Sequence, residues 1–146
     1  MSPQELIGPA IPDRFIHAIR PASAYRHLGS AIDQANQVLY DVELRPLQPD
    51  AWREVSRTVA DRILTRILHR SLAFTSIEIV SRVEAIRSAG IFLAAFGPRA
   101  RYFTNAELTK DGDIGTWMAA SLVTFDAGVV VIGPEHVGVL WAAEDD

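Results

Sequence analysis

The side chains that most often perform catalysis or bind metals are few in this sequence, and their spacing matches no catalytic or metal-binding pattern. The histidines are His17, His27, His69 and His136; no two lie four residues apart, and there is no His-Glu-x-x-His arrangement. The absence of cysteine excludes a thiolate metal site, a cysteine nucleophile and a disulfide framework. There is no Gly-x-Ser-x-Gly turn and no glycine-rich phosphate loop. We therefore expect no catalytic residue, metal ligand or cofactor, which favours a non-enzymatic protein.

One short run of carboxylates, Asp111–Gly115 (DGDIG), has the spacing of the first ligands of a calcium-binding loop. Such a loop needs further oxygen ligands at its fifth and twelfth positions, where this chain has Gly115 and Leu122. The run is therefore interpreted as a turn. Lys110, the only lysine, precedes it, and the neighbouring aspartates would keep its amine charged rather than reactive.

Arginine outnumbers lysine by 13 to 1. This ratio is typical of a GC-rich bacterial genome, and the alternative is that arginine forks are selected to hold phosphate or carboxylate groups. Arg62, Arg66, His69 and Arg70 form a basic stripe on the later turns of a predicted helix. No aromatic residues alternate with them, and cations near a helix end complement its dipole. The stripe is interpreted as structural, and no nucleic-acid binding is expected.

The charge of the chain is distributed unevenly. Residues 1–101 carry 13 Arg and 10 Asp or Glu, a net charge of +3, whereas residues 102–146 carry one Lys and eight acids, a net charge of −7, which together make −4. An acidic segment of this kind repels nucleic acid and anionic membranes and favours a basic protein surface. The alternative is a solvated rim that keeps the protein soluble.

The length and composition bound the class of protein. A chain of 146 residues, 49% apolar and 22% charged, is typical of a single globular domain with its own core. The N-terminus lacks the pattern of a signal peptide, and no run approaches the roughly 18–20 apolar residues of a membrane span. We expect one domain over residues 1–146, with 1–13 as an extended arm or loop, in a cytoplasmic protein without membrane contact.

The first two thirds of the chain favour helices. Apolar spacing predicts helices over residues 24–40 and 51–70, the second capped by Asp50. A third helix is predicted over 75–96, because Thr75 and Glu78 have the spacing of a capping box. The alternative is that this helix ends at Gly90 and that residues 91–96 form a buried strand.

The remaining segments favour β-structure. Strands are predicted over residues 14–20, 100–103, 116–125, 129–132 and 137–143, with turns at 110–113, 126–128 and 133–136. The last three strands would form an antiparallel meander. The predicted fold class is α+β, with about three helices packed on a C-terminal meander of three to four antiparallel strands.

The strands of this meander do not alternate between apolar and polar residues, so both of its faces require cover. Helices on both sides would provide it; the alternatives are a terminal arm, a second subunit or a binding partner. We therefore carry three functional hypotheses. The first is a small acidic protein-binding domain, most specifically an immunity or antitoxin-type inhibitor of a basic partner protein. The second is a small-molecule-binding or enzymatic domain with a pocket between sheet and helices, and the third is a homo-oligomer that pairs through the meander. For the first hypothesis the predicted partner-binding residues are Asp111, Asp113, Asp126, Glu135, Trp141, Glu144, Asp145 and Asp146.

Overall fold

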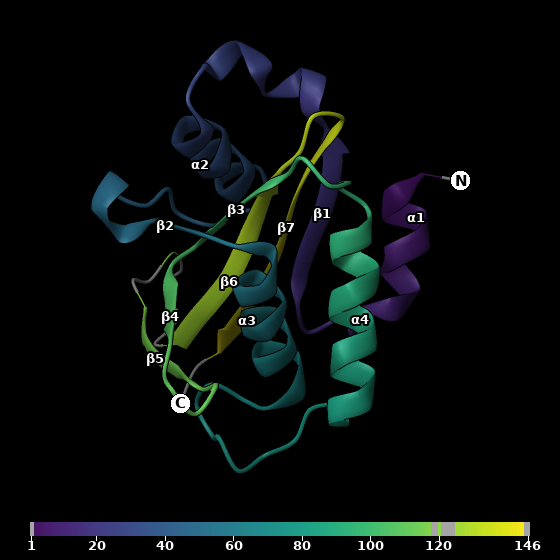
Figure 1. Ribbon diagram of the computed structural model, residues 1–146, viewed down its shortest axis with the longest axis vertical. Coiled ribbons are helices and arrows are strands. Elements are labelled where there is room, and N and C mark those ends of the chain that lie inside the picture. Colours follow the sequence, from purple (N-terminus) through teal and green to yellow (C-terminus); the bar gives the residue numbers. More distant parts are fainter. Residues whose placement is uncertain (1, 118–119, 121–124, 145–146) are drawn as a thin grey trace.

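The fold is α+β, with a five-stranded antiparallel sheet at its centre (Figure 1). The computed structural model describes residues 2–117, 120 and 125–144. The sheet order is β1 (Ile16–Pro21), β7 (His136–Glu144), β6 (Phe125–Ile132), β3 (Arg101–Thr104) and β2 (Arg53–Val55). Two further strands, β4 (Ala106–Leu108) and β5 (Ile114–Trp117), form a separate ribbon. The long central strands β6 and β7 come from the C-terminal part of the chain, as predicted.

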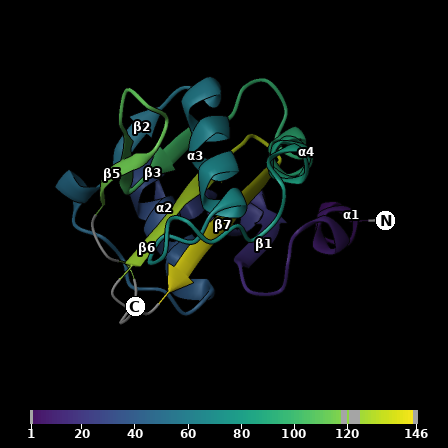
Figure 2. The same ribbon diagram turned by 90° about the horizontal axis from the view of Figure 1, so that it is seen from below.

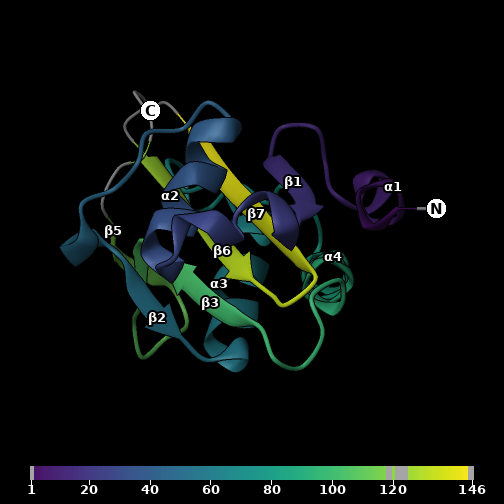
Figure 3. The same ribbon diagram turned by 90° about the horizontal axis from the view of Figure 1, so that it is seen from above.

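Helices cover both faces of the sheet. On one face lie α3 (Arg57–His69) and α4 (Arg82–Ala94), and on the other lies α2 (Ala31–Asp41) (Figures 2 and 3). Alternate residues of β6 and β7 enter two separate cores: Val129 and Leu140 pack with α3 and α4, whereas Val130 and Trp141 pack with α2. Of the alternatives for covering the sheet, helices on both sides is therefore the one that the structure contains. No partner is needed to bury these strands.

The helix starts differ from the predictions. α3 begins at Arg57, where the Ser56 side chain accepts a hydrogen bond from the Val59 amide, and not at residue 51. Residues 53–55 pair with β3 instead, because the preceding Trp52 is drawn into the core on the α2 side and donates through Nε1 to Asn36 Oδ1. The predicted cap at Asp50 is wrong.

The predicted start of the next helix is also wrong. Thr75 and Glu78 lie in the loop between α3 and α4, and the cap of α4 is Ser81, which accepts from the Glu84 amide. Glu78 forms an isolated antiparallel β-bridge with Arg70 at the end of α3, so the backbone at Glu78 is extended and not helical. The helix runs through Gly90 to Ala94, which confirms a single helix and contradicts a strand over residues 91–96.

The strand predictions were better for β1 and β3 than for β6. β1 and β3 lie close to the predicted strands 14–20 and 100–103. The turn predicted at residues 126–128 is wrong, because these residues lie inside β6 and pair with β7. Of the predicted strand 116–125, residues 116–117 belong to β5, Ala120 is outside any strand and residue 125 begins β6; residues 118–119 and 121–124 lie outside the described residues.

The segment expected to be an extended arm contains a short helix, α1 (Pro3–Ile7), followed by a 3-10 turn over Gly8–Ala10. Ser2 and Glu5 form the capping box of α1, and the buried Ile7 anchors it. Gln4 joins it to β1, where its Oε1 accepts from the Ile19 amide at 2.8 Å and its Nε2 lies 3.2 Å from His17 Nδ1. The segment is therefore folded against β1. No helix in the described part of the chain has the length and apolar character needed to cross a membrane.

His17 gives the attachment of α1 a pH dependence. Burial lowers the pKa of His17 below its ordinary value of 6.5, and Asp13 offsets this only in part. The unfolded chain therefore takes up a proton more readily than the folded chain as the pH falls through 6.5, and stability decreases. We expect the wild type to lose more stability on acidification across this pH than His17→Gln. Urea unfolding of both proteins on either side of pH 6.5 measures the difference; equal losses would contradict the assignment.

Candidate functional site

An arginine-lined groove of about 540 Å³ lies between α3, α4 and the turn that connects β4 to β5. It opens to solvent. From α3 it is lined by Asp61, Arg62, Thr65, Arg66, His69 and Arg70, from α4 by Arg82 and Ile86, and from the turn by Asp111, Gly112 and Asp113. Four arginines thus share one groove with three aspartates. We call this feature the arginine groove.

The helical repeat explains why the α3 arginines gather here. Arg62 and Arg66 are four residues apart, so they occupy one side of α3 on successive turns, and Arg70 is the extended residue that caps the end of the helix. The opposite side carries Ile63 and Ile67, which are fully buried against the sheet. Packing of the apolar side therefore turns the arginine side outward, toward α4 and the β4–β5 turn.

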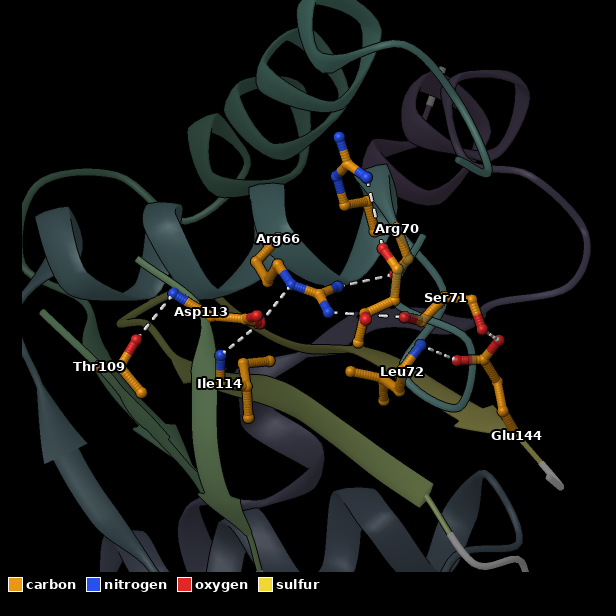
Figure 4. A network of polar contacts seen from close by, with 9 residues as sticks. Arg66, Arg70, Ser71, Leu72, Thr109, Asp113, Ile114 and Glu144 are labelled. Atoms are coloured by element: carbon orange, nitrogen blue, oxygen red, sulfur yellow. Dashed lines mark hydrogen bonds and ion pairs between the residues drawn. The ribbon is translucent and has the colours of Figure 1, made fainter. Parts of the chain in front are cut away.

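Arg66 forms the floor of the groove. Its side chain is only 9% exposed; Nε donates to Asp113 Oδ1 at 2.6 Å and Nη1 donates to the Arg70 carbonyl at 2.8 Å (Figure 4). Asp113 Oδ1 also accepts from the Ile114 amide, and the Asp113 amide donates to Thr109 Oγ1. Arg66 therefore ties the turn to α3, and its own charge is balanced.

The pKa of Asp113 reflects this environment. Partial burial acts to raise it, but hydrogen bonds from the Ile114 amide and Arg66, with the charges of Arg66 and Arg70, hold it below its ordinary value. The carboxylate therefore stays ionised at neutral pH and remains committed to Arg66. Gly112 beside it has a φ of 78°, which suits glycine in a tight turn.

The remaining arginines of the groove are less engaged. Within residues 2–117, 120 and 125–144, the side chains of Arg62 and Arg82 form no hydrogen bond and no ion pair. Arg70 donates through Nη1 to the Thr75 carbonyl at 3.3 Å and forms no ion pair among the same residues. A Cβ atom built at Gly112 would lie 3.5 Å from Arg62 Nη2, so the Arg62 guanidinium reaches the turn. Three guanidinium groups thus retain free N–H donors around the groove.

The other polar side chains of the groove are placed as follows. His69 Nδ1 lies 2.9 Å from the Val80 carbonyl, which accepts its hydrogen, while Nε2 lies 3.7 Å from a Glu78 carboxylate oxygen. This contact fixes the imidazole against the loop that leads to α4. Asp61 Oδ1 is a buried acceptor with no donor among the described residues. The groove therefore offers hydrogen-bond acceptors as well as cationic donors.

The acidic residues predicted to contact a partner do not form one surface in the described part of the chain. Asp111 and Asp113 line the arginine groove. Glu135 is exposed in the turn before β7, and Glu144 is the last residue of β7, at its opposite end. Asp145 and Asp146 lie outside the described residues.

Glu144 fastens the loop after α3 to the end of the sheet. Its Oε1 accepts from Arg14 at 2.7 Å. The same oxygen accepts from the Ser71 hydroxyl at 2.9 Å, and Glu144 Oε2 accepts from the Leu72 amide (Figure 4). Arg66 donates to the carbonyl of Arg70 at the start of the same loop, so hydrogen bonds hold this backbone on both sides of Ser71. Glu144 thus has a structural role here.

Asp126 and Trp141, also predicted to contact a partner, are fully buried. Asp126 Oδ1 accepts from Trp141 Nε1 at 3.2 Å, from Asn105 Nδ2 at 3.2 Å and from the Ala120 amide at 3.0 Å. These contacts join β6 and β7 to Asn105 and Ala120. In this structure neither residue is exposed to a docking partner.

Comparison with protein-family models, curated proteins and solved structures found no match to this chain. In the described residues there is also no group of three or more side chains arranged to hold a metal ion. The candidate site thus depends on its own geometry. Sequence reasoning found Arg62, Arg66 and Arg70 but interpreted them as structural, and it missed Arg82. The signal available was the repeat of three arginines at four-residue intervals in an acidic chain.

Proposed function

We propose that the protein is a non-enzymatic binding protein that holds an anionic group, a carboxylate or a phosphate, in the arginine groove. The observation that carries this proposal is a set of guanidinium groups around one opening, those of Arg62, Arg70 and Arg82, that have no carboxylate partner among the residues the structure describes. Guanidinium forks match the geometry of carboxylate and phosphate oxygens and often bind them in pairs of hydrogen bonds.

The electrostatic cost of the cluster supports the same proposal. Like charges at intervals of four residues repel along a helix, as Arg62 and Arg66 do in α3, and Arg70, the residue that follows the helix, adds a further positive charge beside them. Asp113 compensates Arg66, and the aspartates at positions 61 and 111 moderate the field without forming an ion pair with an arginine. A bound anion would relieve the remaining repulsion.

The proposal of an immunity-type inhibitor with a basic partner is supported by the net charge of −7 over residues 102–146. Such a partner would have less surface to contact, because Asp126 and Trp141 are buried. In addition, Asp113 forms an ion pair with Arg66, and Glu144 forms one with Arg14. The arginine groove is therefore the better supported binding site.

The proposal is tested by titrating the protein with inorganic phosphate at constant ionic strength while following amide and guanidinium signals by NMR. We expect saturable shifts confined to the groove, and a loss of affinity of about tenfold in Arg82→Gln and in Arg62→Gln, because each removes a charged hydrogen-bond donor.

Two matched controls separate the site from general charge. The control variants are Arg87→Gln and Arg57→Gln. Arg87 lies on the same helix as Arg82, and Arg57 lies on the same helix as Arg62; both residues are exposed and neither lines the groove. Their phosphate affinity should equal that of the wild type. If the controls weaken binding as much as the groove variants, or if no saturable shift occurs, the proposed anion site is wrong.

A further inference from the structure

Building on the proposed function, we infer that the natural ligand of the arginine groove is a short acidic peptide segment of a partner protein that carries an apolar side chain. The relevant juxtaposition is that of unpaired arginines with exposed apolar residues on α4. Arg82 lines the groove, and Val83 and Ile86 lie within the next turn of the helix.

The apolar part of the surface is unusually exposed. Val83 is 77% exposed and Ile86, which lines the groove, is 48% exposed. The two are three residues apart, so they share one side of α4. Exposed large apolar side chains beside a charged groove are typical of contact sites for other proteins, and they contribute nothing to the binding of a bare anion.

The size of the groove points the same way. At about 540 Å³ it lies within the range of ligand sites for molecules much larger than one phosphate or carboxylate group. Arg62 in α3, Arg70 just after it and Arg82 in α4 surround this groove, and three guanidinium groups suit more than one anionic group on a single ligand. An acidic peptide offers carboxylates at several points along its length.

The aspartates of the groove distinguish a peptide from other polyanions. Asp61 and Asp111 place carboxylates beside the arginines, and that of Asp111 is exposed to a ligand. Nucleic-acid backbones and anionic membrane surfaces present dense negative charge that these carboxylates would repel. A peptide carries backbone N–H donors between its carboxylates, so it complements both kinds of group.

The inference is tested with the full chain and three labelled probes, read by fluorescence anisotropy. The first probe is the capped peptide Gly-Glu-Glu-Leu-Glu-Glu-Leu-Gly, the second has Ser in place of each Leu, and the third is a short oligothymidylate. We expect the leucine peptide to bind most tightly and the serine peptide about tenfold more weakly, since leucine burial on α4 is lost.

Protein variants locate the apolar contact. Val83→Ser and Ile86→Ser should weaken the leucine peptide to the level of the serine peptide. Val83 does not line the groove, so Val83→Ser should leave the serine peptide and inorganic phosphate unaffected. Tyr40→Ser is the matched control, because Tyr40 is 66% exposed on α2, across the sheet from the groove. Val83→Ser and Ile86→Ser both replace exposed residues of α4, so the variants should remain folded.

The outcomes separate this inference from the proposed function. If both peptides bind equally, or the α4 variants have no effect, while phosphate still binds, the peptide inference is wrong and the anion site stands. If the oligothymidylate or vesicles of phosphatidylglycerol bind more tightly than the leucine peptide, the ligand class is wrong. If phosphate and both peptides fail to bind, both proposals are overturned.

Discussion

Asp126→Ala is expected to lower the free energy of unfolding by about 4 kcal/mol, because it leaves two buried donors without an acceptor at about 1–3 kcal/mol each. These donors are Trp141 Nε1 and the Ala120 amide, whereas Asn105 Nδ2 keeps its bond to the backbone carbonyl of residue 126. All are buried in the core on the α2 side or beside it, so water cannot replace the lost carboxyl group without opening the structure.

Urea unfolding followed by circular dichroism and by tryptophan fluorescence measures this effect. Asp111→Ala is the matched control, since Asp111 is an exposed acid on the β4–β5 turn, and its change should stay within about 0.5 kcal/mol. The two substitutions remove the same charge. Equal effects would show that Asp126 acts only through the net charge of the chain, contrary to the structure.

Gly128→Ala is expected to destabilise the protein by about 3 kcal/mol, the upper part of the range for overpacking a core. Gly128 pairs with Trp141 in β7, and the Trp141 side chain lies over it. A Cβ atom at position 128 would approach the Leu140 carbonyl oxygen and the indole ring to distances that real contacts do not reach. The strand or the indole must shift, and either movement disturbs the bond between Trp141 and Asp126.

Gly90→Ala is the matched control for Gly128→Ala. Gly90 lies in α4, and a Cβ atom there would meet no other atom within 4 Å. Because alanine favours the helix over glycine by about 1 kcal/mol, this substitution should stabilise the protein. Thermal unfolding of both variants should therefore shift in opposite directions. A neutral Gly128→Ala would contradict the close packing of Trp141.

The same two positions show why the C-terminal strands were predicted only in part. Asp and Gly at 126–128 have the composition of a turn, and nothing nearby in the sequence contradicts that interpretation. Their actual roles depend on Trp141 in β7 and on Asn105 in the bend between β3 and β4. A residue that serves a long-range contact can have the same type as one that serves a local turn, so composition does not distinguish them.

The candidate site divides in a similar way. The stripe of Arg62, Arg66 and Arg70 was visible in the sequence because helical periodicity is local. The sequence did not show that these arginines line a binding groove. One reason is that Asp113 forms an ion pair with only one of them, Arg66. The other is that Arg82 reaches the groove from α4, whose start was predicted at the wrong residue. Which charges are compensated is a property of the assembled surface.

By itself, the sequence determined the α+β class, the amphipathic character of α3 and the need to cover both faces of the C-terminal strands. These follow from apolar periodicity and from the missing polar alternation, which act within single elements. Only the tertiary structure decided that α2 covers the second face, that Asp126 and Trp141 are internal, and that three arginines remain around an open groove. The physical reason is that burial and charge compensation depend on side chains brought together from distant parts of the chain.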